Sequence, residues 1–204
     1  YRYFETIPGA AEKVVYPFGY GLSYTTFDVK TVSAGILQPS HTANSQSAPH
    51  DAVSHTDPLY VRVRVTNTGK RAGKEVVQVY AAKPQGKLGK PAKELVAFEK
   101  TRELFSGESQ IVTLTWNIND MASYDDLGKI QTSAYVLEAG SYDIYVGTSV
   151  RDVQKADYSY ILDEDIITEQ LSAKLVPTSL AKRMLSDGSF EELPVRPSHD
   201  PDSE

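Results

Sequence analysis

Residues 59–69 read LYVRVRVTNTG and form the clearest strand pattern in the chain. The odd-numbered residues from Leu59 to Val65 are apolar, whereas the residues between them are polar or aromatic. An alternation with a period of two is typical of a strand that buries one face. The run ends at Asn-Thr-Gly, residues 67–69, where the glycine can adopt a positive φ and close a turn. The sequence therefore predicts a half-buried strand followed by a tight turn.

Further runs of β-branched and aromatic residues lie on both sides of this strand, separated by turn signals roughly every ten residues. They cover residues 24–34, 75–82, 94–100, 110–117, 130–137, 142–147 and 158–162. Between them we expect one helical turn, over residues 119–124, with Asn119 or Asp120 as its cap. Short strands without long helices between them predict an all-β antiparallel sandwich of seven to eight strands.

Two of these runs carry expectations about burial. In residues 75–82 the odd-numbered positions share one face, and Val76, Gln78 and Tyr80 share the other. In residues 94–100 we expect Phe98 to lie near the core together with Leu95 and Ala97.

Composition narrows the class of protein. The 204 residues are 40% apolar and 24% charged, which is ordinary globular usage and corresponds to one domain with appendages. No window is apolar enough for a spanning helix, so we expect no membrane partner. The formal net charge of −6 disfavours nonspecific binding to nucleic acid. The absence of cysteine excludes disulfides and thiolate metal sites. It does not decide the localisation, which stays open between the cytoplasm and secretion from a bacterium.

The organisation along the chain predicts three parts. Residues 1–23 read as a linker and docking segment, and the chain, which starts at a tyrosine, looks like a piece of a longer protein or a processed product. Residues 24–165 read as the sandwich, with a flexible loop over residues 38–58. Residues 166–204 read as a partly disordered extension with a short amphipathic helix over residues 177–185, capped by Ser179 and stopped by Gly188.

No residue pattern predicts a catalytic, cofactor or metal site. Three of the four histidines, His41, His50 and His55, fall in the polar loop, which favours a solvated segment over a metal site. The glycine-rich sequence GKLGK, residues 86–90, lacks the spacing and the Ser/Thr of a phosphate-binding loop. Paired carboxylates could serve a glycosidase, and the candidates are Asp120 with Asp125 and Asp126, and Asp143 with Asp152. Acids beside turns usually serve as caps, and nothing in the sequence selects a pair.

The most unusual stretch is YPFGYGLSY, residues 16–24. Its glycines allow the backbone to bend tightly while the rings point in different directions. Such a density of aromatic residues indicates either stacking on sugars or packing against another domain. The candidate residues for a domain interface, or for a position near a sugar, are Tyr16, Phe18, Tyr20, Leu22 and Tyr24.

The same stretch carries a family resemblance. Residues 16–27, YPFGYGLSYTTF, resemble the start of the C-terminal fibronectin type III-like domain of family-3 glycoside hydrolases, the β-glucosidase and β-xylosidase family. Further motifs of that domain follow in order: VRVTNTG at 63–69, AGKEVVQVY at 72–80, KPAKELVAFEK at 90–100 and AGSYDIYVGTS at 139–149. The resemblance covers residues 1–165; Ala97 replaces the usual glycine, and the loop at 38–58 is longer than in the family.

The resemblance implies an immunoglobulin/fibronectin III-like sandwich and a parent protein that hydrolyses β-glucosides or related sugars with retention. In the family, the nucleophilic aspartate and the acid/base glutamate lie on other domains, and neither motif is found in this chain. We therefore expect an accessory domain that is inactive alone and stabilises the catalytic domains of the same protein, its partners, through residues 1–24. The alternatives are a stand-alone carbohydrate-binding module and an adhesion module of the fibronectin type.

Overall fold

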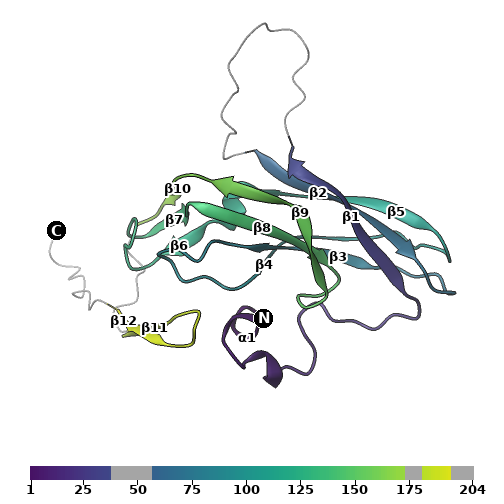
Figure 1. The fold of residues 1–204 in the computed structure, drawn as a ribbon, viewed down its shortest axis with the longest axis horizontal. Coiled ribbons are helices and arrows are strands. Elements are labelled where there is room, and N and C mark those ends of the chain that lie inside the picture. Colours follow the sequence, from purple (N-terminus) through teal and green to yellow (C-terminus); the bar gives the residue numbers. More distant parts are fainter. Residues whose placement is uncertain (38–56, 173–180, 194–204) are drawn as a thin grey trace, which may run out of the picture.

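The computed structural model describes residues 1–37, 57–172 and 181–193. Two antiparallel sheets face each other (Figure 1). The first has the order β1-β2-β5, with β1 at Phe27–Ile36, β2 at Pro58–Asn67 and β5 at Ser109–Asn117. The second has the order β4-β3-β8-β9, with β4 at Glu94–Lys100, β3 at Val76–Ala82, β8 at Gly140–Gly147 and β9 at Val153–Leu162. The predicted all-β antiparallel immunoglobulin/fibronectin III-like sandwich is confirmed.

The core lies between the two sheets and follows the alternation read from the sequence. On β2, the four apolar residues from Leu59 to Val65 have no exposed surface, whereas Arg62 and Arg64 are exposed. The opposing sheet contributes the inward residues of β3 and β8. The buried side chains from these two strands are Val77, Val79, Ala81, Tyr142, Ile144 and Val146. Burial of this apolar surface is the main force that holds the sheets together.

The turn after β2 differs from its prediction in mechanism. Gly69 does not have a positive φ. A side chain at this position would meet the Thr25 hydroxyl, and its Cβ would lie 2.8 Å from the Thr26 nitrogen. Asn67, which is fully buried, accepts hydrogen bonds from Thr25 and Gly69 and donates to the Leu104 carbonyl. The glycine is therefore needed for the close approach of the chain that precedes β1.

Three short strands form a further sheet at one end of the sandwich. Their order is β10-β7-β6, with β10 at Ile166–Gln170, β7 at Ala134–Leu137 and β6 at Ser123–Asp125. The helical turn expected nearby is a 3₁₀ turn, η2, at Ile118–Met121. Its N-cap is Asn117 rather than Asn119 or Asp120, and Asp120 instead accepts a hydrogen bond from the Asn117 nitrogen at 3.1 Å. This reciprocal pair is a capping box.

The C-terminal extension corrects the predicted helix over residues 177–185. Its described part contains β11, at Lys182–Met184, which pairs antiparallel with β12, at Phe190–Glu192. Arg183 lies opposite Glu191 and bonds to it, and Gly188, with φ of 86°, lies in the hairpin turn instead of stopping a helix. These cross-strand contacts outweigh the helical periodicity of the sequence. Ser179, the expected cap, lies outside the described residues.

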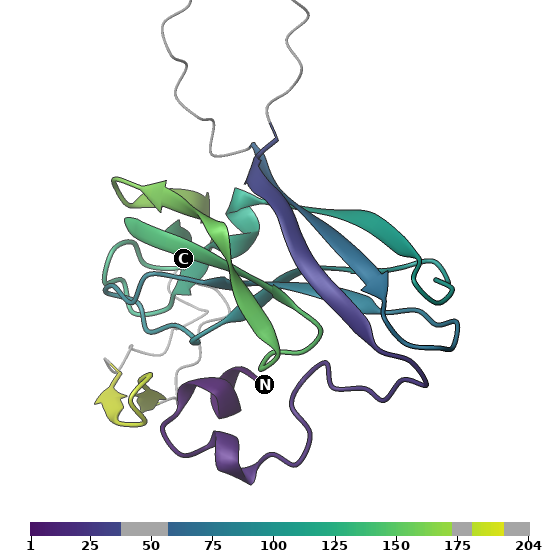
Figure 2. The same cartoon turned by 45° about the vertical axis from the view of Figure 1, so that its right-hand side comes forward.

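The N-terminal segment, which we define as residues 1–26, covers the outer face of the β4-β3-β8-β9 sheet. It contains α1, at Arg2–Thr6, and a 3₁₀ turn, η1, at Ala11–Lys13. Figures 1 and 2 both place it below this sheet, on the same side as the β11–β12 hairpin. We call this outer face the covered face, and the outer face of the β1-β2-β5 sheet the open face.

Several predictions cannot be followed further. The loop at 38–56, all four histidines and the tail at 194–204 lie outside the described residues. The boundaries predicted at 23/24 and 165/166 stay predictions. Among the helices of the described residues, none has the length and apolar character needed to cross a bilayer.

Candidate docking surface

Three aromatic rings fix the start of the N-terminal segment to the covered face. The Tyr1 ring stacks on Phe18, with 4.5 Å between centroids, and meets Tyr80 of β3 edge-on at 6.2 Å. The Tyr1 hydroxyl also accepts a hydrogen bond from the Leu95 nitrogen of β4 at 2.8 Å. Tyr80 is fully buried, and this burial raises the pKa of its hydroxyl, which stays neutral and donates to Gln78. The outward side of β3 is therefore a second packed layer rather than a solvated one.

Gly19 brings the segment into direct contact with β3. Its φ is +83°, and a side chain at this position would collide with the Gln78 amide. The Gln78 side chain is itself fixed, because its nitrogen donates to the Thr148 carbonyl at 2.7 Å. The Phe18 carbonyl accepts a hydrogen bond from the Val150 nitrogen at 2.9 Å. The backbone around residues 18–19 is thus held on the sheet by a close approach that only glycine permits.

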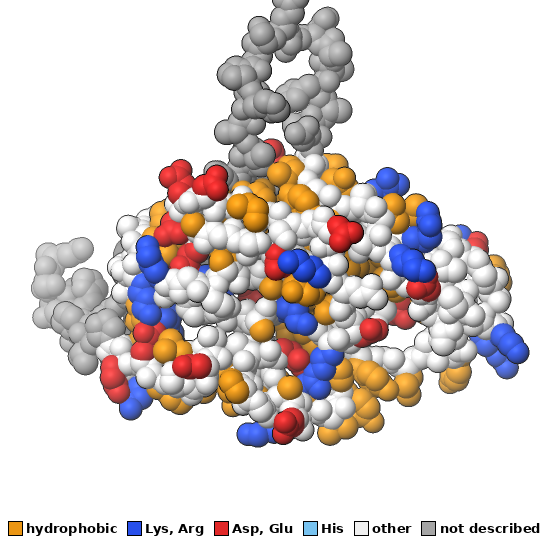
Figure 3. Space-filling view, in the orientation of Figure 1, with side chains coloured by type: hydrophobic (Ala, Val, Ile, Leu, Met, Phe, Trp, Pro, Cys, Tyr) orange, Lys and Arg blue, Asp and Glu red, His pale blue; other side chains and the backbone are white. Residues whose placement is uncertain are grey.

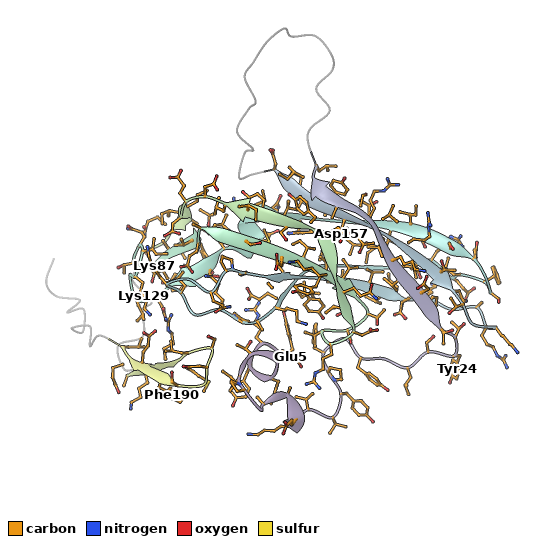
Figure 4. All side chains as sticks on the ribbon, viewed as in Figure 1. Glu5, Tyr24, Lys87, Lys129, Asp157 and Phe190 are labelled. Carbon is orange, nitrogen blue, oxygen red and sulfur yellow. The ribbon has the colours of Figure 1, made fainter. Side chains whose placement is uncertain are left out.

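Ionic contacts hold α1 on the same face. Arg2 pairs with Glu94 of β4 at 2.9 Å, and Glu94 also pairs with the buried Lys83. Burial lowers the pKa of Lys83, and the neighbouring Glu94 opposes this shift by favouring the charged amine. On the other side of the helix, Arg151 donates to Glu5 at 2.9 Å. Figure 4 shows Glu5 on α1, facing the body of the domain.

The five candidate residues keep much of their surface exposed although the segment is anchored. The exposed fractions are 68% for Tyr16, 43% for Phe18, 49% for Tyr20, 90% for Leu22 and 97% for Tyr24. The structure stacks Tyr16 on Tyr20, with 5.0 Å between centroids, whereas the Phe18 ring stacks on Tyr1. Leu22 and Tyr24 lie further along, towards β1, and Figure 4 shows Tyr24 at that end. Hydrophobic side chains gather along this lower margin in Figure 3.

A polar groove runs beside the exposed end of the segment. Residues 21–29 form one wall, and the ends of β8 and β9 form the other. Three carboxylates line it, from Asp28, Glu75 and Asp152, together with threonine hydroxyls. Burial raises the pKa of Glu75, and the negative charge of Asp152 adds to that shift. The groove offers hydrogen-bonding groups close to an exposed apolar surface.

The carboxylates that were candidates for glycosidase chemistry each bind groups of the domain itself. Asp120 completes the capping box, and Asp125 accepts five backbone N–H groups from residues 127–131 at 2.7 to 3.2 Å. Asp126 pairs with Arg183. Asp143 pairs with Lys155, and Asp152 accepts from the Thr148 hydroxyl. In the structure these aspartates therefore serve turns, strand pairs and the C-terminal hairpin.

The glycine-rich loop at 86–90 surrounds a carboxylate of its own chain. The nitrogens of Lys87 and Leu88 donate to Glu138, and Lys90 forms a buried ion pair with it. A side chain on Gly86 would collide with the same carboxylate. Within the described residues, no group of three or more histidine, aspartate or glutamate side chains is placed to hold a metal ion.

Two features of the covered face were not predicted from the sequence. Tyr1 was not singled out, although its ring lies at the centre of the aromatic anchor. Phe98, which we expected near the core, is 68% exposed. The pairing of β3 with β4 shifts between Val79 and Tyr80, and this bulge changes which residues of β4 point outward. Ala97 packs against the core, so simple alternation already places its neighbour Phe98 on the outer side of β4. The bulge instead brings Leu95 opposite the outward Tyr80.

Comparisons with known proteins agree with this architecture. The sequence profile of the fibronectin type III-like domain family matches residues 75–150. β-Glucosidase A of Butyrivibrio fibrisolvens is 56% identical over 194 residues, which is 95% of this chain and 23% of that protein. The β-glucosidase of Ruminococcus albus is 38% identical over 96% of this chain and 19% of that protein. The solved structure of a β-glucosidase from Paenibacillus barengoltzii superposes with a TM-score of 0.82 at 40% identity, over 97% of this chain and 21% of that one.

The chain thus spans about a fifth of the length of these relatives. The motifs at 90–100 and 139–149 lie within the matched region, and the motif at 72–80 overlaps its start. The sandwich has the predicted type. Residues 75–150 thus match the fibronectin type III-like domain family, in a chain that is similar to one part of longer β-glucosidases.

Proposed function

We propose that this chain is the accessory, stabilising β-sandwich of a family-3 β-glycosidase and that its N-terminal segment docks on the catalytic domains of the same protein. The observation that carries the proposal is the segment itself. The segment is fixed to β4 through the Tyr1 hydroxyl and to the turn after β8 through the Phe18 carbonyl. The side chains of Tyr16, Leu22 and Tyr24 nevertheless remain mostly exposed. An ordered apolar surface of this kind marks an interaction site. Exposing these apolar side chains to water would not stabilise a domain that has no partner.

The similarity to β-glucosidases supports the nature of the partner. Because the chain corresponds to about a fifth of those proteins, we propose that the catalytic machinery lies in the rest of the parent. Retaining hydrolysis uses two carboxyl groups about 5 Å apart on either side of the scissile bond. The candidate aspartates of this chain are engaged in turns and ion pairs, so we assign both catalytic carboxylates to the parent's other domains.

The proposal is tested by separating the parent into this chain and the remainder. We expect the chain alone to show no turnover of an aryl β-glucoside and to bind the separately produced remainder. Tyr24→Ala should weaken that binding, because Tyr24 is 97% exposed and contributes nothing to the fold that truncation would disturb. Clear turnover by the chain alone would overturn the proposal. So would a remainder that neither binds the chain nor loses stability without it.

A second candidate function is a stand-alone carbohydrate-binding module. The stacked pair of Tyr16 and Tyr20 and the polar groove beside Leu22 favour it, since sugars bind to aromatic faces and hydrogen-bonding side chains. A titration with cello-oligosaccharides separates the two functions. Saturable binding that is lost in Tyr20→Ala would support the module, whereas no binding would favour the docking function.

A further inference from the structure

Phe98 lies on the covered face. In the pairing of β3 with β4 it is directly opposite Gln78, so the two side chains point to the same side of the sheet. Gln78 points towards Gly19 of the N-terminal segment. Phe98 therefore shares a face with the segment, in the row next to the residue that the segment touches.

The cover ends just before it reaches Phe98. Gln78 is only 6% exposed, and Leu95, on the same strand as Phe98, is held by the Tyr1 hydroxyl. Phe98 nevertheless keeps 68% of its surface exposed. Phe98 thus adds an exposed apolar side chain on the sandwich itself, opposite the Gln78 residue that Gly19 approaches.

We infer that the docking surface extends across β4 and that Phe98 is a second apolar anchor for the catalytic part of the same protein. This inference rests on the proposed function. Two observations select the occupant. The chain corresponds to about a fifth of its relatives, so most of such a protein would lie outside it, and Phe98 lies on the same face as the segment that we propose to dock.

The geometry gives Phe98 the properties of an anchor. It projects from a strand that is hydrogen-bonded along β3, so its backbone position is fixed before docking. Aromatic residues on rigid elements lose little conformational entropy when they are buried, and they dominate the binding energy of interfaces. A rigid anchor beside the more exposed rings of the segment would set the orientation of the two domains.

The test compares Phe98 with an exposed apolar residue of the open face. Ile111 lies on β5 opposite Arg64 and is 41% exposed. Phe98→Ser and Ile111→Ser are measured by calorimetry for binding to the separately produced remainder of the parent. We expect the dissociation constant to rise about tenfold or more in Phe98→Ser and to stay unchanged in Ile111→Ser. Phe98→Leu, which keeps an apolar side chain, should lose much less affinity.

The outcomes separate the inference from the proposed function. If the unaltered chain binds the remainder and Phe98→Ser binds equally well, the inference fails while the proposed function stands. If the unaltered chain does not bind, the proposed function fails first. Concentration-dependent self-association of the chain, abolished by Phe98→Ser, would show that a second copy occupies the surface and would overturn the inference. Circular dichroism and the melting temperature establish that each variant is folded.

Discussion

β2 and β3 are both interior strands of their sheets, and their inward residues are equally buried, but their outward residues differ. On β2, Arg62 and Arg64 point into solvent on the open face. On β3, the outward Gln78 and Tyr80 are buried beneath the N-terminal segment. One sheet therefore has a single packed face, and the other has two.

This difference supports the proposal that the covered side of the sandwich meets the rest of the parent protein. The layer over β3 comes from the N-terminal segment. Around residues 18–19 the N-terminal segment is attached through rings, a close glycine contact and a backbone hydrogen bond, and α1 adds two ion pairs. The hairpin of β11 and β12 lies on the same side and is attached through the ion pairs of Arg183 and Lys129 (Figure 4). The open face carries no such layer in the described residues, so a neighbour is expected to meet the covered one.

The largest expected effect separates two outward tyrosines. Tyr80→Ala removes a fully buried ring that Tyr1 packs against, and we expect it to lower the free energy of unfolding by about 3–5 kcal/mol. Tyr60→Ala, at the half-buried matching position of β2, should cost about 1 kcal/mol or less. Urea denaturation of both variants measures the difference. Equal losses would show that the two faces are energetically alike and would remove the basis of the comparison.

The second effect concerns the turn that holds the hairpin. Asp125→Asn replaces a fully buried carboxylate that accepts five backbone N–H groups, and it should cost about 3 kcal/mol at neutral pH. Asp126 and Lys129 lie in the same turn and bind the hairpin, so the hairpin should loosen while the N-terminal segment stays in place. Amide hydrogen exchange measured in the hairpin and in the N-terminal segment tests this prediction. Faster exchange in both the hairpin and the N-terminal segment would mean that the two are held in place as one unit.

The stability lost in Asp125→Asn should depend on pH, because Asp125 titrates and asparagine does not. Burial alone would raise the pKa of Asp125, but the hydrogen bonds from Ile130, Gln131, Lys129 and Gly128 outweigh it and lower the pKa below 3.8. A group with a lowered pKa in the folded state stabilises the fold above its unfolded pKa, and this contribution declines as the pH falls through the folded value. The stability difference between the unaltered chain and Asp125→Asn should therefore be constant above about pH 5 and shrink in stronger acid.

The sequence predicted which residues face the core, but it did not predict that the N-terminal segment covers the outer face of β3. The reason is physical. The alternation on β2 reports burial against the opposite sheet, and it is confirmed at Val61, Val63 and Val65. On β3 the outward residues Gln78 and Tyr80 look like a solvated face, because the ring that covers them comes from Tyr1, far away in sequence. The helix expected at 177–185 failed similarly, since Arg183 finds its partners in Asp126 and Glu191. Local periodicity cannot encode a partner that is brought in by the tertiary fold.

The five candidate residues show how much of the proposed docking surface could be predicted from the sequence. Tyr16, Phe18, Tyr20, Leu22 and Tyr24 were selected by aromatic and apolar density alone, and all retain exposed surface. Their role as an interface stays a prediction until docking is measured. Phe98 was expected near the core together with Leu95 and Ala97. In the structure it alternates with Ala97, which packs on the core, and lies opposite the outward Gln78.

A smaller effect sharpens the comparison at a single contact. Gly19→Ala places a side chain on a residue with φ of +83° and against the fixed Gln78 amide, so it should cost about 2 kcal/mol. Gly21→Ala is the matched control, because its side chain would meet no atom within 4 Å. Thermal unfolding compares the two variants. If both lose the same stability, the segment does not depend on its close approach to β3.

The smallest effect distinguishes the two attachments by salt. Sodium chloride at about 1 M reduces the Debye length to about 3 Å and should weaken the pairs of Arg183 with Asp126 and of Lys129 with Glu191, at a cost below about 1 kcal/mol. Exchange of the Leu185 amide, which bonds within the hairpin, should accelerate. Exchange of the Val150 amide, which bonds to Phe18, should not change. In Arg183→Gln the hairpin should already be loosened and should respond less to salt. Equal acceleration at both amides would mean that the hairpin and the N-terminal segment are held by contacts of the same kind. Acceleration at Leu185 alone would identify the N-terminal segment as the permanent part of the proposed docking surface.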